Sequence, residues 1–213
     1  ESGFVWLQGE AGMGKSRLLA EFYQRLSGEP LHVWRGACLS QNTQQPFTLF
    51  SSLLRDIFGL SNADTPEEHR DNLQAGLERM VINQREVQPY LELLCGIAPA
   101  EADAQRLAAL EPEALRQQIF VAVRALLVGM VQQRPLLLML DDLHWIDPMS
   151  AALLAFLAQM AASMPVLFIL AHRPFDGQIS QSNQNELDSI RNLYLERTWK
   201  AVLPGLTREE GRQ

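Results

Sequence analysis

The chain has 213 residues, of which 47% are hydrophobic and 20% are charged, and its formal net charge is −7. This length suits one globular domain with a substantial core, and the composition excludes an intrinsically disordered chain. The acidic balance excludes a general electrostatic attraction to nucleic acids or to an anionic membrane surface. An anion bound by this chain must therefore be held by a local site.

The first elements in chain order are a strand, a glycine-rich loop and a helix. Phe4 to Gln8 is a short apolar run of strand-forming residues, and GEAGMGKS follows it directly. Beyond Lys15, apolar positions recur at helical spacing until Gly28 and Pro30 end the pattern. These apolar positions are Leu18, Leu19, Phe22 and Leu26.

A second strand and helix follow, and then a different pattern. Residues 31–37 read as a strand and residues 47–58 as a helix with apolar side chains on one face. From Ser61 to Leu110 the pattern becomes helical and polar, and Thr65, Pro66 and Glu68 form a capping-box start. We therefore predict a helical insertion over residues 61–111.

The second half of the chain alternates helices with aliphatic runs. A long helix is predicted over residues 112–131, and residues 136–140 form a continuous aliphatic run that is typical of a buried parallel strand. Asp147 and Pro148 begin a helix that should run through Ala162, and residues 166–171 form another buried strand.

The uncharged window from Met149 to Ala171 is long enough to cross a bilayer, but Pro165 would break a spanning helix. We interpret the window as a buried helix followed by a buried strand. A weak helix over residues 184–194 and a last strand over residues 199–203 complete the chain. The alternation predicts an α/β fold, in which helices cover both faces of a parallel sheet.

The glycine-rich segment Gly9 to Ser16 matches G-x-x-x-x-G-K-[ST] between a strand and a helix, the context that identifies a phosphate-binding loop. In such a loop the backbone N–H groups converge on phosphate oxygens, Lys15 reaches the β- and γ-phosphates, and the Ser16 hydroxyl binds Mg²⁺. The residues expected to bind the nucleotide are Gly9, Glu10, Ala11, Gly12, Met13, Gly14, Lys15, Ser16 and Arg17.

Two adjacent carboxylates end the aliphatic strand in LLLMLDDLHWID, and such a pair needs a compensating cation. Because parallel strands end at one edge of a sheet, Asp141 can face the glycine loop and hold a nucleotide-bound Mg²⁺ together with Ser16. Asp142 is then placed to orient or deprotonate an attacking water. The alternative is that Asp142 caps a helix or forms an ion pair.

Two further residues near these motifs have open roles. His144 could be a metal ligand together with the aspartates, but no second His or Cys lies at ligand spacing, and a contact to phosphate or to a neighbouring module is an alternative. Arg173 follows the strand in FILAHRP and could sense the γ-phosphate, and the alternative is an ordinary surface arginine. The two cysteines, Cys38 and Cys95, are expected to be reduced core thiols.

Together, GEAGMGKSRLL, LLLMLDDLHWID and FILAHRP resemble the nucleotide-binding domain of the STAND class of P-loop ATPases, which are signal transduction ATPases with numerous domains. The similarity runs from about Gly3 to the end of the chain. It is greatest to the modules of large bacterial regulators that carry LuxR-type DNA-binding domains or cyclase domains.

The resemblance implies an AAA-like P-loop NTPase core of the ASCE type, with a parallel sheet of about five strands in the order 5-1-4-3-2. It assigns Lys15 and Ser16 to the Walker A motif, Asp141 and Asp142 to the Walker B motif, and Arg173 to a sensor arginine with a catalytic role alongside Lys15 and Asp142. Residues 1–213 then form one nucleotide-binding domain, and LPGLTREE is similar to the join to a winged-helix lid expected after residue 213.

The function implied is a regulatory ATPase that binds ATP or ADP with Mg²⁺, hydrolyses slowly, and serves a signalling or transcription-regulating protein. One alternative is a non-hydrolysing, nucleotide-dependent scaffold, and another is a P-loop ATPase that acts on nucleic acid, against which the acidic charge counts. The expected partners are the nucleotide and further copies or neighbouring domains, without direct contact to nucleic acid or membrane. The expected location is cytoplasmic.

Overall fold

The computed structural model describes residues 2–80, 82–174, 180–193 and 195–203. The chain divides into two compact units, which we call the sheet unit (residues 1–48 and 135–213) and the helical unit (residues 49–134). The candidate site residues all belong to the sheet unit. Its strands are β1 (Gly3–Gln8), β2 (His32–Ala37), β3 (Leu136–Asp141), β4 (Val166–His172) and β5 (Thr198–Val202).

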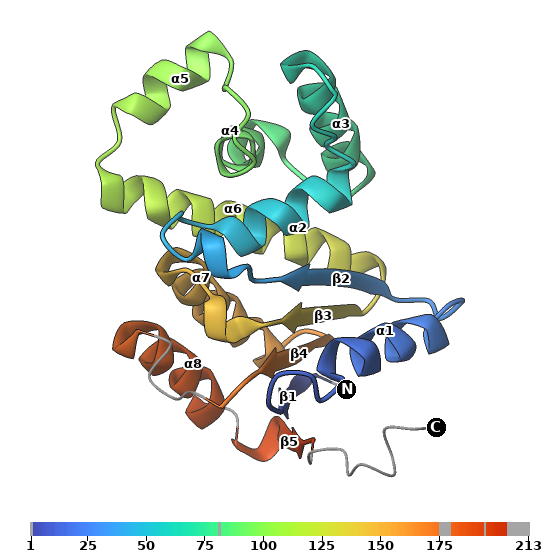
Figure 1. Cartoon of the computed structure of the whole chain (residues 1–213). Helices are drawn as coiled ribbons and strands as arrows, with labels where there is room; N and C mark the ends of the chain where they lie inside the picture. The colour runs from blue at the N-terminus through green and yellow to red at the C-terminus, as the bar shows by residue number, and fades with distance from the viewer. Residues whose placement is uncertain (1, 81, 175–179, 194, 204–213) are drawn as a thin grey trace. The chain divides into compact units, whose positions relative to one another are not determined.

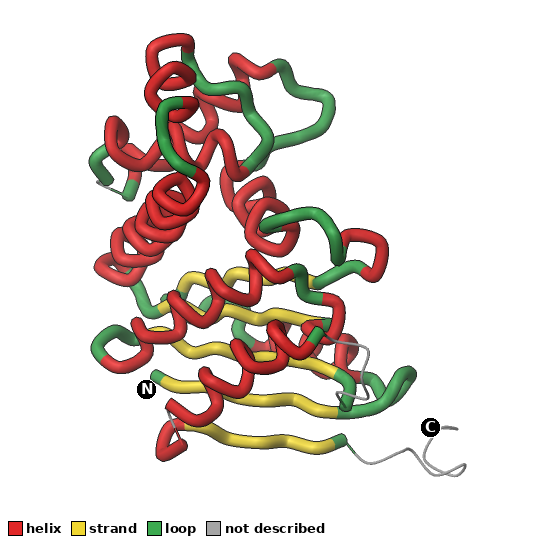
Figure 2. Tube along the Cα trace, turned by 90° about the vertical axis from the view of Figure 1, so that its left-hand side faces the viewer, coloured by secondary structure: helices red, strands yellow, loops and turns green. Residues whose placement is uncertain are grey.

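The five strands form one parallel sheet in the order β2-β3-β4-β1-β5 (Figure 1). Read from the other edge this is 5-1-4-3-2, so the predicted fold class and strand order are confirmed. β4 lies between β1 and β3, as the resemblance implied. Because all strands run in the same direction, their carboxyl ends meet at one edge, and the loops after β1, β3 and β4 lie there (Figure 2).

Helices cover both faces of the sheet because consecutive strand residues point to opposite faces. Leu7 of β1 packs in one apolar cluster with Leu19 of α1 (Lys15–Arg25). Trp6, the preceding residue, faces the other way, where Arg191 of α8 (Gln181–Leu193) lies 4.7 Å from its ring centroid. α8 packs against α7 (Pro148–Ala158) on that side of the sheet.

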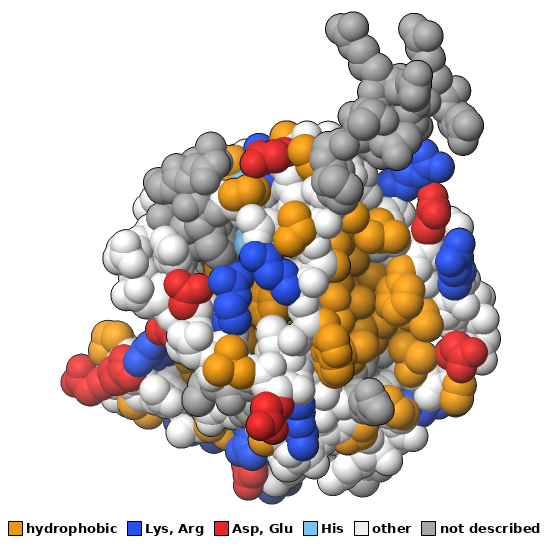
Figure 3. Space-filling view, turned by 90° about the horizontal axis from the view of Figure 1, so that it is seen from below, with side chains coloured by type: hydrophobic (Ala, Val, Ile, Leu, Met, Phe, Trp, Pro, Cys, Tyr) orange, Lys and Arg blue, Asp and Glu red, His pale blue; other side chains and the backbone are white. Residues whose placement is uncertain are grey.

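The helix α1 leaves part of its face of the sheet uncovered. A groove of about 300 Å³ runs beside it, and hydrophobic side chains gather on the face seen from below (Figure 3). The groove is lined by Val5, Leu7, Leu18, Leu19, Phe22, Leu167, Ile169 and Ala201.

Several predicted boundaries shift in the structure. α7 begins at Pro148 as predicted but ends at Ala158, and the predicted remainder through Ala162 is the 3₁₀ helix η3 (Gln159–Ala162). Burial of Met160 and Ala161 continues across this change, so hydrophobicity alone could not locate it. β5 begins one residue earlier than predicted, at Thr198. The predicted helix over residues 184–194 corresponds to α8, and its last residue lies outside the described residues.

The helical unit packs its own apolar core. Leu53, Leu73, Leu91 and Leu126 are each at most 1% exposed. The predicted capping box is present, because Thr65 Oγ1 accepts from Glu68 N at 3.2 Å and Thr65 N donates to Glu68 Oε2 at 2.7 Å. The predicted insertion, residues 61–111, falls within this unit. The helices here are α2 (Thr48–Phe58), α3 (Pro66–Arg79), α4 (Gln84–Leu94), α5 (Glu101–Ala108) and α6 (Pro112–Gln133).

By length and apolar content, α6 is the one helix among the described residues that could cross a membrane. It packs against α4 and buries side chains such as Leu126 and Leu127, as the core helix of a globular unit does. The uncharged window from residue 149 to 171 is a helix followed by the buried strand β4, as predicted. Cys38 and Cys95 are both buried free thiols, also as predicted.

Candidate functional site

The loop between β1 and α1 takes a backbone path that glycine favours. Gly12 has a φ of 78° and Gly14 a φ of 80°, in the left-handed region that side chains disfavour. Gly14 caps α1, and the first helical hydrogen bond runs from Leu18 N to Gly14 O at 2.8 Å. The N–H groups of Lys15, Ser16 and Arg17 therefore have no acceptor within the helix and carry its partial positive charge. Such a helix N-terminus favours an anion.

The side chain of Lys15 lies over this loop. It is 6% exposed, and its Nζ donates to the carbonyls of Gly9 at 2.8 Å and of Glu10 at 3.0 Å. Both acceptors are neutral, and no salt bridge to Lys15 exists among the residues that the structure describes. Its charge is therefore available to a phosphate at the loop.

Ser16 and Asp141 meet across the sheet edge. The Ser16 hydroxyl donates to Asp141 Oδ2 at 2.6 Å, although 125 positions separate the two residues. Asp141 Oδ1 accepts from the N–H of Asp142 at 2.8 Å, which fixes the carboxylate. A hydroxyl and one carboxylate at such a distance suit Mg²⁺, which is bound in proteins by one or two carboxylates plus phosphate oxygens. The donor set therefore fits the expected ion.

Asp142 has an unusual backbone. Its φ of 54° and ψ of 37° place it in the left-handed region, at the start of the 3₁₀ helix η2 (Leu143–Trp145). Burial and the neighbouring Asp141 charge raise the pKa of Asp142, while Lys15 and Arg173 act in the opposite direction. The side chain makes no capping hydrogen bond, so the structure does not show the capping role. A carboxylate that lies among two cations and a second carboxylate can accept a proton from a water.

Arg173 directly follows β4 and reaches the same cluster. It is half-buried, and its charge bears on the pKa of both Asp142 and His144. The preceding His172 is 2% exposed, its Nδ1 lies 2.6 Å from the carbonyl oxygen of Arg173, and burial lowers its pKa to about 4. The structure therefore brings Arg173 to the sheet edge together with Lys15 and the two aspartates.

The remaining residues predicted to bind the nucleotide offer the loop backbone groups rather than side chains. Glu10 and Ala11 are exposed, and Met13 N donates to Glu10 O at 3.4 Å. The Arg17 side chain pairs with Glu21 at 2.9 Å on the exposed side of α1. Its guanidinium is therefore directed to Glu21, and Arg17 offers the loop its backbone N–H.

Asp147 does more than the predicted helix cap. It accepts from Ser150 N at 2.9 Å as a cap should, but it also accepts from Phe47 N at 2.9 Å and Thr48 N at 3.0 Å. It is 1% exposed, and Phe47 is held in a left-handed conformation with φ 62°. The sequence indicates the helix cap at Asp147, but it contains no signal for the hydrogen bonds from Phe47 and Thr48, which lie about 100 residues away.

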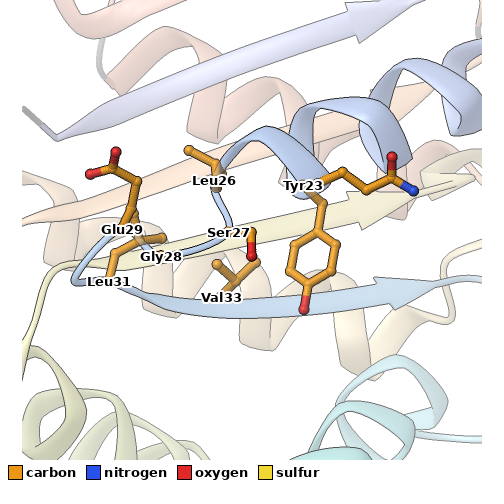
Figure 4. Close-up of a pocket in the computed structure, with 8 residues that line it drawn as sticks. Tyr23, Leu26, Ser27, Gly28, Glu29, Leu31 and Val33 are labelled. Atoms are coloured by element: carbon orange, nitrogen blue, oxygen red, sulfur yellow. The ribbon is translucent and has the colours of Figure 1, made fainter.

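A larger hollow lies at the opposite end of α1. It measures about 590 Å³ and is formed by the last turn of α1 and the connection to β2 (Figure 4). None of the predicted site residues lines it. The lining residues are Tyr23, Gln24, Leu26, Ser27, Gly28, Glu29, Leu31 and Val33.

Comparison with known proteins identifies the family of this chain. Residues 1–169 match the AAA ATPase domain family. An uncharacterized protein of Rhizobium meliloti (strain 1021) is 30% identical over 178 residues, which cover 82% of this chain and 16% of that protein. The chain thus spans about a sixth of the length of this relative.

Solved structures that are similar to this chain include a chain from the Drosophila ORC complex bound to AT-rich DNA and Cdc6. That chain is 12% identical with a TM-score of 0.41, over 99% of this chain and 53% of its own. VirB4 of Thermoanaerobacter pseudethanolicus is also 12% identical, with a TM-score of 0.40, over 96% of this chain and 78% of its own. At these identities and scores the likenesses say nothing about function.

Proposed function

Because the chain belongs to the AAA ATPase domain family, we propose that its sheet unit binds ATP with Mg²⁺ and hydrolyses it slowly, as the switch of a longer, STAND-type signalling protein. The observation that carries the proposal is the 2.6 Å hydrogen bond between Ser16 Oγ and Asp141 Oδ2. It joins the Walker A loop to the Walker B strand at the one edge where a triphosphate would meet both.

Each site residue has one role in this proposal. The N–H groups at the start of α1 bind the β-phosphate, and the Lys15 ammonium leaves its carbonyl acceptors to bridge the β- and γ-phosphates. Ser16 and Asp141 would hold the ion, directly or through water. Arg173 faces the γ-phosphate, where its charge opposes the negative charge that develops there.

Hydrolysis then needs a base for the attacking water. The water oxygen forms a bond to the γ-phosphorus, the bond from that phosphorus to the β–γ bridging oxygen breaks, and the water proton passes to Asp142. The products are ADP, inorganic phosphate and a proton. A Mg²⁺ ion held by Ser16 and Asp141 would neutralise charge on the phosphate oxygens. The raised pKa of Asp142 suits a group that takes up this proton and releases it later.

The turnover should be slow because the aspartate at position 142 reaches one methylene less far than glutamate would. The same shortness favours the second candidate, a scaffold that binds nucleotide without hydrolysing it. The acidic net charge of −7 counts against a third, an ATPase that acts on nucleic acid.

The switch role rests on the resemblance of the three motifs and on the much longer relative. In this proposal residues 1–213 are one cytoplasmic nucleotide-binding domain with its insertion at 61–111, and a winged-helix lid follows. Nucleotide state would change the contacts of the module with neighbouring domains or with further copies of itself. The module would not bind nucleic acid or membrane directly.

Single-turnover phosphate release distinguishes the enzyme from the scaffold. The protein is mixed in excess with γ-labelled ATP and Mg²⁺, and release is compared between the unsubstituted protein and Asp142→Asn. We expect measurable release that falls at least about 100-fold in the variant, because general-base catalysis contributes roughly 10²–10⁴-fold. ATP affinity should stay within about threefold. ATP binding without any release in the unsubstituted protein would favour the scaffold.

A further inference from the structure

His144 is a buried polar side chain that the proposed function does not yet use. It lies in the middle of η2 and is 3% exposed. Neither ring nitrogen makes a hydrogen bond with any residue that the structure describes. Its ring lies 5.0 Å from that of Trp145, tilted by 45°. A buried imidazole without a hydrogen bond is disfavoured in folded proteins.

The carboxylate of Asp142 lies close to the His144 ring, and the charges of Arg173, Lys15 and Asp141 also act on it. His144 Nδ1 lies 3.9 Å from Asp142 Oδ1, about 1 Å beyond a normal hydrogen bond. Rotation of one side chain can close a gap of this size, and hydrogen bonds in active sites commonly tighten when substrate binds. The two groups are therefore positioned to become partners.

The Asp142 side chain is the one of the two that can move. The backbone beneath His144 is fixed, because Trp145 N donates to Asp142 O at 2.9 Å and Ile146 N donates to Leu143 O at 3.2 Å. Asn183 of α8 holds the end of the turn through its Nδ2, which donates to Ile146 O at 2.7 Å. The Asp142 side chain, in contrast, is 38% exposed, whereas that of His144 is 2% exposed.

The charge state of His144 suits a donor to a carboxylate. Burial lowers its pKa to about 4, and the charges of Arg173 and Lys15 act in the same direction. The imidazole is therefore neutral near pH 7 and carries one N–H group. With that proton on Nδ1, the ring can donate to Asp142 without placing a further buried positive charge beside Lys15 and Arg173.

We propose that His144 is a positioning residue, which directs Asp142 by donating a hydrogen bond from Nδ1 to Oδ1. The proposal rests on the proposed ATPase function. Without such a bond, the carboxylate is drawn toward Lys15 and Arg173 and repelled by Asp141, and none of these forces aims it at a water. With Oδ1 bound to His144, Oδ2 remains as the proton acceptor. His144 itself touches neither the nucleotide nor the water.

A set of substitutions separates this role from simple packing. His144→Asn keeps an amide N–H close to the position of Nδ1, whereas His144→Gln places it close to Nε2, and His144→Leu fills the volume without a donor. We expect single-turnover phosphate release to fall at least 10-fold in His144→Leu and His144→Gln but less than threefold in His144→Asn. ATP affinity should stay within twofold in all three, because the residue does not contact the nucleotide. Equal losses in Asn and Leu would overturn the proposal.

The dependence on Asp142 is the second test. In an Asp142→Asn background, His144→Leu should lower phosphate release by less than twofold, because the carboxylate that it directs is gone. A full 10-fold loss in that background would show that His144 acts elsewhere and would overturn the proposal. Thermal unfolding of every variant, compared with the unsubstituted protein, controls for loss of fold.

The tautomer of His144 can be measured without any substitution. Nitrogen chemical shifts of the unsubstituted protein, with Mg²⁺ and a non-hydrolysable ATP analogue, should show the proton on Nδ1 and a bare Nε2. A proton on Nε2 would overturn the role proposed for His144 and would leave the proposed ATPase function untouched. If the unsubstituted protein neither binds nor hydrolyses ATP, the proposed function fails, and this inference fails with it.

Discussion

The two ends of α1 differ in what they can bind. At its N-terminus, backbone N–H groups without an acceptor in the helix, a buried ammonium and two carboxylates converge within a short loop and two strand ends. At its C-terminus there is a pocket of about 590 Å³, and Glu29 is the only acidic or basic residue that lines it. Convergence of charge, rather than the size of a hollow, therefore identifies the candidate site.

A glycine lies at each end of α1, so the two ends can be compared at a similar backbone conformation. Gly14 at the loop has a φ of 80° and Gly28 beyond the C-terminus has a φ of 92°, and a Cβ at either position would meet nothing within 4 Å. The backbone requirement is therefore similar at the two ends. Gly14 lies beside Lys15 and Ser16, whereas Gly28 lies beside Ser27 and Glu29, whose carboxylate would repel a phosphate.

The largest effect is expected from Lys15→Ala. The ammonium should make two charge-assisted hydrogen bonds to phosphate oxygens, each worth about 2 kcal/mol, so ATP affinity should fall about 1,000-fold. Ser27→Ala, at the other end of α1, is the matched control and should change affinity less than twofold. Isothermal titration calorimetry measures both. If ATP affinity is unchanged in Lys15→Ala but falls in Ser27→Ala, the nucleotide binds at the C-terminal end of α1 and not at its N-terminal end.

Acid should destabilise the folded protein through two buried histidines near the phosphate-binding end. His144 and His172 lie there, and burial lowers the pKa of each from 6.5 to about 4, whereas no histidine lines the C-terminal pocket. Between pH 6.5 and about pH 4, each histidine is protonated in the unfolded chain but neutral in the folded chain. The free energy of unfolding therefore falls as the pH decreases below 6.5.

From pH 7 to pH 5 the loss should be about 2 kcal/mol for each of these histidines. Urea unfolding at the two pH values measures it. Replacing His172 by Asn should remove about half of the pH dependence assigned to the pair. If the free energy of unfolding of His172→Asn depends on pH as strongly as that of the unsubstituted protein, His172 does not contribute to this dependence.

A smaller effect is expected from Asp141→Asn. The amide is a weaker ligand for Mg²⁺ than the carboxylate, so the gain in ATP affinity that Mg²⁺ provides should fall about 10-fold. Asp188→Asn on α8, which removes a carboxylate that pairs with Arg191 at 3.7 Å, is the control. Nucleotide binding measured with Mg²⁺ and with a chelator tests this. An unchanged response to Mg²⁺ in Asp141→Asn would exclude Asp141 as a ligand.

The smallest effect separates backbone strain from ligand binding. Gly14→Ala and Gly28→Ala should each destabilise the fold by about 1 kcal/mol, because each forces a side chain into the left-handed region. Only Gly14→Ala should also weaken ATP binding, by about 10-fold. Thermal unfolding and nucleotide titration of both variants test the pair. Equal ATP affinities would remove the functional difference between the two loops.

The sequence predicted the fold and the contact between Ser16 and Asp141 because the signals for the loop and for the strands are local. The glycine spacing around Lys15 specifies a loop, the aliphatic runs specify buried parallel strands, and the rule that such strands end at one edge brought Ser16 to Asp141. The left-handed backbone of Asp142 could not be predicted, because only a minority of aspartates adopt that conformation and no local pattern marks which of them do. The bonds from Phe47 and Thr48 to Asp147 depend on packing between distant segments, which no local pattern encodes.

A crystal structure with Mg²⁺ and a non-hydrolysable ATP analogue is the most direct test of the central claim. We expect the β-phosphate against the N–H groups of Lys15 and Ser16, and the ion between Ser16 Oγ and the Asp141 carboxylate. Nucleotide bound instead in the pocket beside Tyr23, with the Ser16–Asp141 hydrogen bond intact, would contradict the claim.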